Sequence, residues 1–386
     1  RLLLILPNHE ACKGRKALRI MHTLSLSGYR FDRYLRKRKG PGLKTIWIAP
    51  PSDEEPNYRR AMKLARPLAR AASWTRDLGN TPPNDANPSW MAEQAAEMAE
   101  RLGLSCEVLE ESELAEMGMG GILAVGQGSK QQSRLVQLAG GSGKELVALV
   151  GKGVTFDTGG ISIKPSSGME EMKYDKVGAC AVLGIVQALS ELAIPIRFQA
   201  CLPLVENMPG GSSYRPGDII RTYSRKTVEI VDTDAEGRLI LADALSLAAE
   251  KRPDYLIELS TLTGASVVAL GHHGAALYSP DDVLADDLLE AAASSGERLW
   301  RMPLWSEFDK EMKGVQADLR NLGVRWGGAN SAAAFLANFM GRVKRWAHLD
   351  IAGPAYQASR EARKSGATGF GVGLVVDWLL AKTESF

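Results

Sequence analysis

The sequence is poor in the residues that mark several common kinds of functional site. Its four cysteines form no C-x-x-C pair, so neither a disulfide framework nor a cysteine-held zinc site is expected. Its five histidines form no H-E-x-x-H motif, which argues against a histidine-based zinc site. The G-x-S-x-G and Walker A patterns are also absent. We interpret the cysteines as reduced core residues of a cytoplasmic protein.

Long apolar runs and a strong net charge are missing as well. The formal net charge is only +2, so the composition calls for neither nucleic acid nor an anionic membrane as the main partner. The apolar stretch from Gly369 to Ala381 is interrupted by Asp377 and is too short to span a bilayer, and no secretory signal is apparent. With 386 residues, 45% of them hydrophobic, the chain can bury a large core and form two domains.

What the chain does have is an unusual acidic segment, VDTDAEGRL, at residues 231–239. Its charged residues stand at alternate positions, so in an extended backbone they would share one face. These residues are Asp232, Asp234, Glu236 and Arg238. Crowded carboxylates repel one another unless a cation neutralises them, and a divalent metal ion is the strongest candidate. The alternative is an acidic surface turn that caps a helix.

Apolar periodicity and breaker residues predict strands that alternate with helices, and hence an α/β fold with a mixed, mostly parallel sheet flanked by helices. The predicted strands are 2–6, 44–50, 105–109, 135–138, 145–150, 196–204, 227–231, 255–260, 275–279 and 346–351. The predicted helices are 16–26, 58–78, 88–102, 112–117 with Ser112 as its cap, 176–192, 239–251, 281–294, 331–343 and 371–382. We divide the chain into a small N-terminal α/β domain, residues 1–60, and a larger catalytic domain, residues 61–386. Because the chain starts at Arg1 rather than Met, we expect the small domain to be incomplete.

A second segment, GKGVTFDTGG at residues 151–160, follows an apolar strand and carries Lys152 and Asp157. Glycines there allow the backbone to approach a ligand closely, and a lysine between them tends to be desolvated. Lys164 follows shortly after, and Asp175 precedes a predicted helix. Taken alone, Lys164 is compatible with an exposed lysine and Asp175 with a helix cap.

Together these segments resemble a known family. Residues 150–165, VGKGVTFDTGGISIKP, and 232–239, DTDAEGRL, are similar to the two signatures of the leucyl aminopeptidase (cytosol aminopeptidase) family. Further similar segments are 29–34, 76–84, 260–265, 317–323 and 346–353, so that the resemblance covers nearly the whole chain and is most specific from Arg76 onward. It implies a metal-dependent exopeptidase that releases N-terminal residues, preferentially leucine and other apolar ones, from peptides with a free N-terminus.

The resemblance also implies roles for individual residues. Two divalent metal ions, zinc or manganese, would be held by Lys152, Asp157, Asp175 and Glu236 at one position and by Asp157, Asp234 and Glu236 at the other. Lys164 would be the catalytic electrophile, and Arg238 would hold a bicarbonate ion as general base for attack by a metal-bridged hydroxide. Met172, Thr261, Leu262 and Gly264 would contact the substrate. The family further implies a homohexamer.

The chain departs from the family pattern at two positions. Asp232 stands where the family usually has Asn, which adds an acid near the metals. Lys176 stands where the family usually has Met, which places a positive charge either beside the site or on the solvent side of a helix.

Two other functions remain open at this point. Another two-metal hydrolase, such as a phosphatase or amidohydrolase, would use similar ligands. A DNA-binding or scaffolding role would rest on the basic run Arg33–Lys39, and the small net charge argues against it as the main role.

Overall fold

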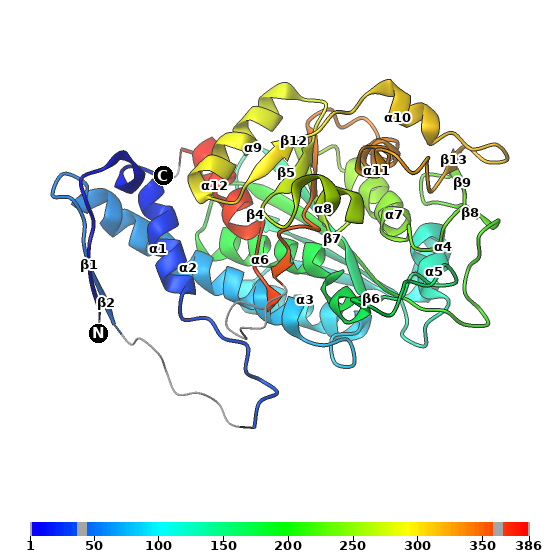
Figure 1. Cartoon of the computed structure of the whole chain (residues 1–386), viewed down its shortest axis with the longest axis horizontal. Coiled ribbons are helices and arrows are strands. Elements are labelled where there is room, and N and C mark those ends of the chain that lie inside the picture. Colours follow the sequence, from blue (N-terminus) through cyan, green and yellow to red (C-terminus); the bar gives the residue numbers. More distant parts are fainter. Residues whose placement is uncertain (1, 37–44, 358–365, 385–386) are drawn as a thin grey trace.

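The protein is described by a computed structural model that covers residues 2–36, 45–357 and 366–384. Its centre is a nine-stranded sheet with helices on both faces (Figure 1). The strand order is β12-β11-β14-β10-β5-β7-β4-β3, and β6 pairs with β7 beside this path. Most neighbouring strands of this sheet are parallel, whereas β3–β4, β4–β7 and β11–β14 are antiparallel. The predicted α/β fold with a mixed, mostly parallel sheet is confirmed.

The strands of the central sheet are β3 (Ser105–Leu109), β4 (Arg134–Gly141), β5 (Leu146–Gly151), β6 (Gly153–Asp157), β7 (Arg197–Asn207), β10 (Tyr255–Ser260), β11 (Ala275–Tyr278), β12 (Leu299–Arg301) and β14 (Trp346–Asp350). Three small sheets are formed by β1 (Leu2–Ile5) with β2 (Ile46–Ala49), by β8 (Ile219–Arg221), β9 (Thr227–Glu229) and β13 (Leu319–Arg320), and by β15 (Tyr356–Gln357) with β16 (Gly366–Ala367).

The α-helices are α1 (Lys16–Leu26), α2 (Glu55–Asn80), α3 (Pro88–Leu102), α4 (Glu111–Met117), α5 (Gly120–Gly126), α6 (Val177–Glu191), α7 (Gly237–Glu250), α8 (Gly264–Leu270), α9 (Asp282–Ser295), α10 (Ser306–Glu311), α11 (Gly328–Ala337) and α12 (Val372–Lys382). Two short 3-10 helices are η1 (Glu10–Cys12) and η2 (Met169–Tyr174).

Each face of the sheet has its own hydrophobic core. Along β5, Val147 and Leu149 belong to a core shared with α2, α6, α9 and α12, whereas Ala148 and Val150 belong to a core shared with α5, α7 and α11. This alternation is the two-residue period of a strand that is buried on both sides, and it explains why β5 is an unbroken apolar run.

Local sequence signals place several elements where they were predicted. Helix α3 starts at Pro88, the side chain of Asn87 accepts a hydrogen bond from Trp90 N at 2.9 Å, and the helix ends at Gly103 with φ of 67°. Proline in the first turn, a side-chain cap and a left-handed glycine are the usual signals of helix ends. The predicted bounds 88–102 are therefore those observed.

Other predicted bounds are wrong. The helix predicted at 331–343 is α11, Gly328–Ala337, and β6 was not predicted at all. Helix α4 is capped not by Ser112 but by Glu110. The Glu110 side chain accepts the backbone N–H of Glu113, and the Glu113 side chain accepts the backbone N–H of Glu110. This capping box satisfies two backbone N–H groups at once, which a cap two residues later would not do.

The N-terminal elements β1, β2 and α1 lie at one end of the molecule (Figure 1). They are not independent of the rest: Ala17, Leu18 and Met21 of α1 belong to the same core as α2 and α6, and the guanidinium of Arg15 lies 2.6 Å from the carboxylate of Asp377 in α12. The predicted boundary at residue 60 falls within the continuous helix α2. The two-domain division stays a prediction.

Two sequence-based expectations concern binding surfaces. Among the residues that the structure describes, no helix combines the length and apolar character needed to cross a membrane. Part of the basic run Arg33–Lys39, residues 37–39, lies outside the described residues, because 37–44 are among those left out.

Candidate metal centre and substrate pocket

The acidic segment forms a turn rather than an extended strand. Strand β9 ends at Glu229, the backbone N–H of Asp234 donates to the Asp232 carboxylate at 2.8 Å, and α7 begins at Gly237. Glu236 already has helical backbone angles, φ −76° and ψ −39°. The extended backbone in which the alternating residues would share one face is therefore not adopted, because an aspartate side chain that accepts a backbone N–H two residues on favours a turn. The predicted strand-to-helix junction itself is confirmed.

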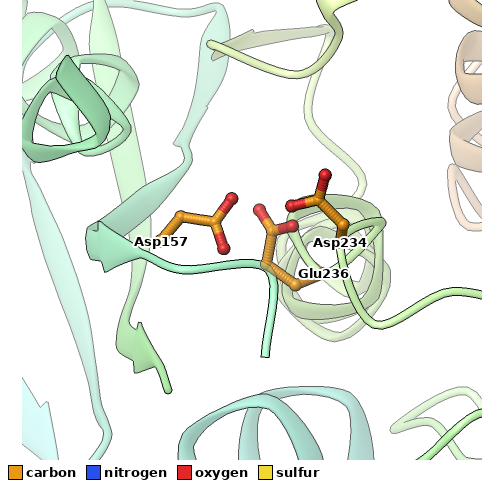
Figure 2. A group of neighbouring side chains, drawn as sticks. All are labelled: Asp157, Asp234 and Glu236. Carbon is orange, nitrogen blue, oxygen red and sulfur yellow. The ribbon is translucent and has the colours of Figure 1, made fainter. Parts of the chain in front are cut away.

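Three carboxylates nevertheless meet at this junction. Each of Asp157, Asp234 and Glu236 offers one oxygen, and these oxygens lie within 4.8 Å of one another. Figure 2 shows the three side chains pointing toward one another, with Asp157 at the end of β6 and Glu236 at the start of α7. The meeting point lies at the carboxyl ends of parallel strands, which is where ligands bind in open α/β sheets.

Lys152, directly after β5, contacts this cluster. It is 2% exposed, and its Nζ lies 2.8 Å from both the Asp175 and the Glu236 carboxylates and donates to Thr261 O at 3.1 Å. Burial alone would lower the pKa of Lys152, but the neighbouring carboxylates outweigh it and raise the pKa above its ordinary value. In this arrangement the ammonium neutralises the acids, and it would have to lose its proton to become a metal ligand.

Lys164 neutralises the other side of the cluster. Its Nζ lies 2.8 Å from the Asp157 carboxylate and forms a second ion pair with Asp234. Burial, followed by repulsion from Asp157 and Glu236, raises the pKa of Asp234 to about 7. Burial likewise raises the pKa of Asp157. Carboxylates that are hard to ionise without a cation are suited to binding one.

Asp175 comes from the end of η2 and faces the same space. One of its oxygens accepts a hydrogen bond from Thr261 Oγ1 at 2.8 Å, while the other, Oδ2, is buried and has no hydrogen-bond partner within the described chain. Burial raises its pKa well above the ordinary value. The predicted ligand Asp175 is thus not the cap of α6: that position belongs to Lys176.

A pocket of about 230 Å³ opens onto this cluster. Most of the site residues predicted from the sequence line it: Lys152, Asp157, Lys164, Met172, Asp175, Asp234, Glu236, Thr261, Leu262 and Gly264. The remaining wall residues include Tyr174, Val267 and Tyr356, and the rings of Tyr174 and Tyr356 stack with centroids 4.7 Å apart. The pocket therefore joins a charged floor to a largely apolar wall.

Arg238 is the one predicted site residue outside this lining. It is buried in the first turn of α7, and its Nη1 donates to Asn321 O at 2.8 Å. Its Nε is buried without a hydrogen-bond partner among the described residues, and burial lowers its pKa to about 10. A buried guanidinium with a free donor is suited to binding an anion.

Several residues that hold the site in place were not predicted. Asn207, at the end of β7, donates to Asp157 Oδ1 at 2.8 Å and to Thr233 O at 3.0 Å. Asp350, at the end of β14, accepts from Leu262 N at 3.2 Å and from Thr263 Oγ1 at 2.7 Å, and so shapes the predicted substrate loop. Their only sequence signal is position: each ends a strand whose carboxyl end faces the site.

The two departures from the family pattern have different outcomes. Asp232 uses its carboxylate to form the turn before Asp234. Lys176 is fully buried, and its Nζ donates to the carbonyl oxygens of Gly79, Thr81 and Lys173. Of the two alternatives for Lys176, the solvent side of a helix is therefore wrong: its ammonium is enclosed by backbone carbonyls and interacts with the charge of Asp175, and burial lowers its pKa to about 8.

Comparison with known proteins shows the family of the chain. The model of the cytosol aminopeptidase family, catalytic domain, matches residues 73–376. The chain belongs to the cytosol aminopeptidase family. A probable cytosol aminopeptidase from Nitrosomonas eutropha is 46% identical over 364 residues, covering 93% of this chain and 72% of the relative. One from Chlorobium limicola is 47% identical over 364 residues, with 91% and 72% covered.

The fold is also found in a solved relative. The bottromycin maturation enzyme BotP, in complex with Mn, superposes with a TM-score of 0.88 at 39% identity, over 95% of this chain and 80% of that one. Membership in the cytosol aminopeptidase family makes the chain a metal-dependent hydrolase that acts at the N-terminus of peptides. The residues present fit divalent metals, because three carboxylates converge and Asp175 Oδ2 is buried without a partner in the described structure.

Proposed function

We propose that the protein is a two-metal aminopeptidase that prefers leucine and other apolar residues at the N-terminus of its substrates. The observation that carries the proposal is the convergence of Asp157, Asp234 and Glu236 within 4.8 Å at the floor of a pocket with an apolar wall. A free α-amino group can ligate a metal and an internal peptide bond cannot, which restricts such a site to the end of a chain.

The metal ligands would be those that face the cluster. Lys152, Asp157, Asp175 and Glu236 would hold one ion, and Asp157, Asp234 and Glu236 the other. Bound metal ions of this kind act as Lewis acids and lower the pKa of water toward neutrality. The ions would be zinc or manganese: oxygen-rich ligands accept several metals, and the solved relative BotP was obtained in complex with Mn.

Lys164 and Arg238 would act on the substrate rather than on the metals. The Lys164 ammonium would donate a hydrogen bond to the scissile carbonyl oxygen as negative charge develops there, an effect commonly worth about 3–4 kcal/mol. Arg238 would hold a bicarbonate ion, whose planar oxygens match the planar guanidinium, as the general base. Its unpartnered, buried Nε supports this role.

The side chain of the substrate's first residue would lie in the apolar part of the pocket. Met172, Leu262 and Gly264 line it together with Val267 and Ala352. Thr261 lies at the boundary between this wall and the charged floor, because its hydroxyl is bonded to Asp175. An aliphatic side chain such as that of leucine gains most from such surroundings.

The assembly and the location of the protein are part of the same proposal. As in the family that it resembles, the chain would form a homohexamer and work in the cytoplasm. Peptides with a free N-terminus would be its partners, with no role for membranes and no main role for nucleic acid. Size-exclusion chromatography with light scattering measures the assembly state directly.

Metal removal and replacement test the activity. Leucine amide hydrolysis should disappear after dialysis against a chelator and return when manganese or zinc is added. N-acetyl-leucine amide and a phosphate ester should not be cleaved, since neither offers a free amine. Far-UV circular dichroism before and after dialysis checks that the stripped protein stays folded. Undiminished turnover without metal, or equal cleavage of the acetylated amide, would contradict the proposal.

A further inference from the structure

A second pocket, of about 260 Å³, lies at the amino ends of β10 and β14, whereas the candidate metal centre lies at the carboxyl ends of the strands. Its walls come from the connection between α7 and β10 and from the connection between α11 and β14. They are formed by Ala249, Arg252, Pro253, Asp254, Arg342, Val343, Lys344 and Arg345. Strand β10 runs from this pocket to Thr261, a separation of about 20 Å for six residues, so the two pockets share no residue.

Four of the wall residues carry a positive charge, and the chain as a whole has a net charge of only +2. Among the residues that the structure describes, no carboxylate is within 4.0 Å of the charged nitrogens of Arg252, Arg342, Lys344 or Arg345. The single acid in the wall, Asp254, is engaged elsewhere, since its Oδ2 accepts a hydrogen bond from Leu146 N at 2.8 Å. Crowded cations without counter-charges attract anions for the same reason that crowded carboxylates attract metals.

All four cationic residues are exposed, and two of them have a distinctive backbone conformation or ring contact. Arg252 has φ of 49°, a left-handed conformation that glycine or asparagine adopts more easily than arginine. Arg345 lies over the ring of Tyr255, with its guanidinium carbon 5.4 Å from the ring centroid, and its Nη1 lies 3.4 Å from Tyr255 Oη. A residue held in an unfavourable backbone conformation at a pocket wall is a reason to look for a ligand there.

We propose that this pocket, formed by Arg252, Arg342, Lys344 and Arg345, binds a compact anion made of two or three linked phosphate groups. Guanidinium groups match the oxygens of phosphate through paired hydrogen bonds, and the lysine adds a point charge. Four cations and one carboxylate leave the wall with three positive charges in excess, which calls for an anion with several charges. The pocket is small and concave, so it is suited to such an anion and not to the extended backbone of a nucleic acid duplex.

Titration calorimetry of the 386-residue chain with sodium tripolyphosphate, at low and at high sodium chloride, tests this site. We expect saturable binding that weakens as salt increases. The triple variant Arg252→Ala/Arg342→Ala/Lys344→Ala should lose affinity by about tenfold or more. A control triple, Lys63→Ala/Arg66→Ala/Lys130→Ala, removes the same number of exposed positive charges elsewhere and should stay within about twofold of the parent protein.

The remaining outcomes are also decisive. Both triples leave the candidate metal ligands intact, so any removal of metal by tripolyphosphate is common to them and cancels in the comparison. No measurable binding to the parent, or equal loss in both triples, would overturn the proposal. Binding of a short DNA duplex that tripolyphosphate cannot displace would overturn it too, since the surface would then be a nucleic-acid site. Thermal unfolding of each variant confirms that it is folded.

Discussion

Two buried acidic side chains, Glu236 at the cap of helix α7 and Asp243 two turns later, are stabilised in opposite ways. Glu236 lies 2.8 Å from the Lys152 ammonium, which outweighs the effect of burial and lowers the pKa of Glu236. Asp243 has no cation within 4.0 Å among the described residues; it accepts hydrogen bonds from Tyr223 N at 2.7 Å and Ile122 N at 2.9 Å. Burial raises the pKa of Asp243 to about 7.

The difference separates a ligand from a structural carboxylate. Glu236 lines a pocket and is paired with the ammonium of Lys152, a positive charge that a metal ion can replace. Asp243 is fully buried and accepts hydrogen bonds from backbone N–H groups at the start of α5 and in the segment after β8, so it joins these segments to α7. A metal ion cannot replace such backbone donors without leaving them unsatisfied. Both carboxylates are buried, so the kind of partner, and not the burial, decides which acid can take part in chemistry.

The largest expected effect comes from the metal ligands. Asp157→Ala or Glu236→Ala should abolish leucine amide hydrolysis, by about a thousandfold or more, and lower metal content at the same time. Metal content is measured by mass spectrometry of the dialysed protein. Asp243→Ala is the matched control on the same helix: it should destabilise the fold while its metal content stays normal. Normal metal loading in Glu236→Ala would contradict the role of Glu236 as a metal ligand and so its contrast with Asp243.

Arg238, next to Glu236, should behave differently from its neighbour. Arg238→Ala should lower kcat by about a hundredfold, on the scale of a lost general base, and leave the metal content unchanged, because no metal ligand is removed. Added bicarbonate should stimulate the parent protein and not the variant. Parallel loss of metal and activity in Arg238→Ala would show that the residue supports the ligands instead.

The pH dependence of the free energy of unfolding tests the role of Asp243. Its pKa in the folded protein, about 7, is above the ordinary value of 3.8, so the folded state binds its proton more tightly than the unfolded state. The stabilisation is therefore complete below about pH 4 and is lost as the pH rises through 7, by about 2–4 kcal/mol. Urea unfolding of the parent and of Asp243→Asn between pH 5 and 8 isolates this contribution. The difference between them should shrink as the pH rises; a constant difference would show that Asp243 does not titrate in this range.

The smallest effect is expected at Asp232. Its carboxylate accepts the backbone N–H of Asp234, and the amide oxygen of asparagine can accept the same bond. Asp232→Asn should therefore change the free energy of unfolding by less than about 0.5 kcal/mol, with turnover within about twofold of the parent. A large change in metal affinity would mean instead that the charge of Asp232 acts on the metals.

The sequence was sufficient for those features whose causes are local or carried by the two signature segments. Strand 255–260 and helix 88–102 have the predicted bounds, because apolar runs and caps define them. The alternation of charges did not decide the backbone of 232–238, because a side-chain bond inside the segment makes it a turn and not the extended chain in which the charges would share a face. Asn207 and Asp350 were not predicted because they reach the site only after distant strands align.

Nor does the sequence distinguish Glu236 from Asp243 by physical pattern alone. Both are acids on one helix, and only the family signature singles out Glu236. What separates them is the tertiary neighbour: Lys152 comes from β5, whereas Ile122 comes from α5. Such neighbours depend on how the sheet and both helical layers assemble, which no spacing along the chain encodes.

The buried ammonium of Lys176 limits how the chain can be shortened. Two of its acceptors are Gly79 O, in the last turn of α2, and Thr81 O just beyond it. A fragment beginning after Thr81 would keep this charge inside the protein with most of its acceptors removed, directly beside Asp175. Proteolytic trimming or truncation past α2 would therefore disturb the catalytic unit even though every predicted metal ligand is retained, and a minimal active fragment has to include the end of that helix.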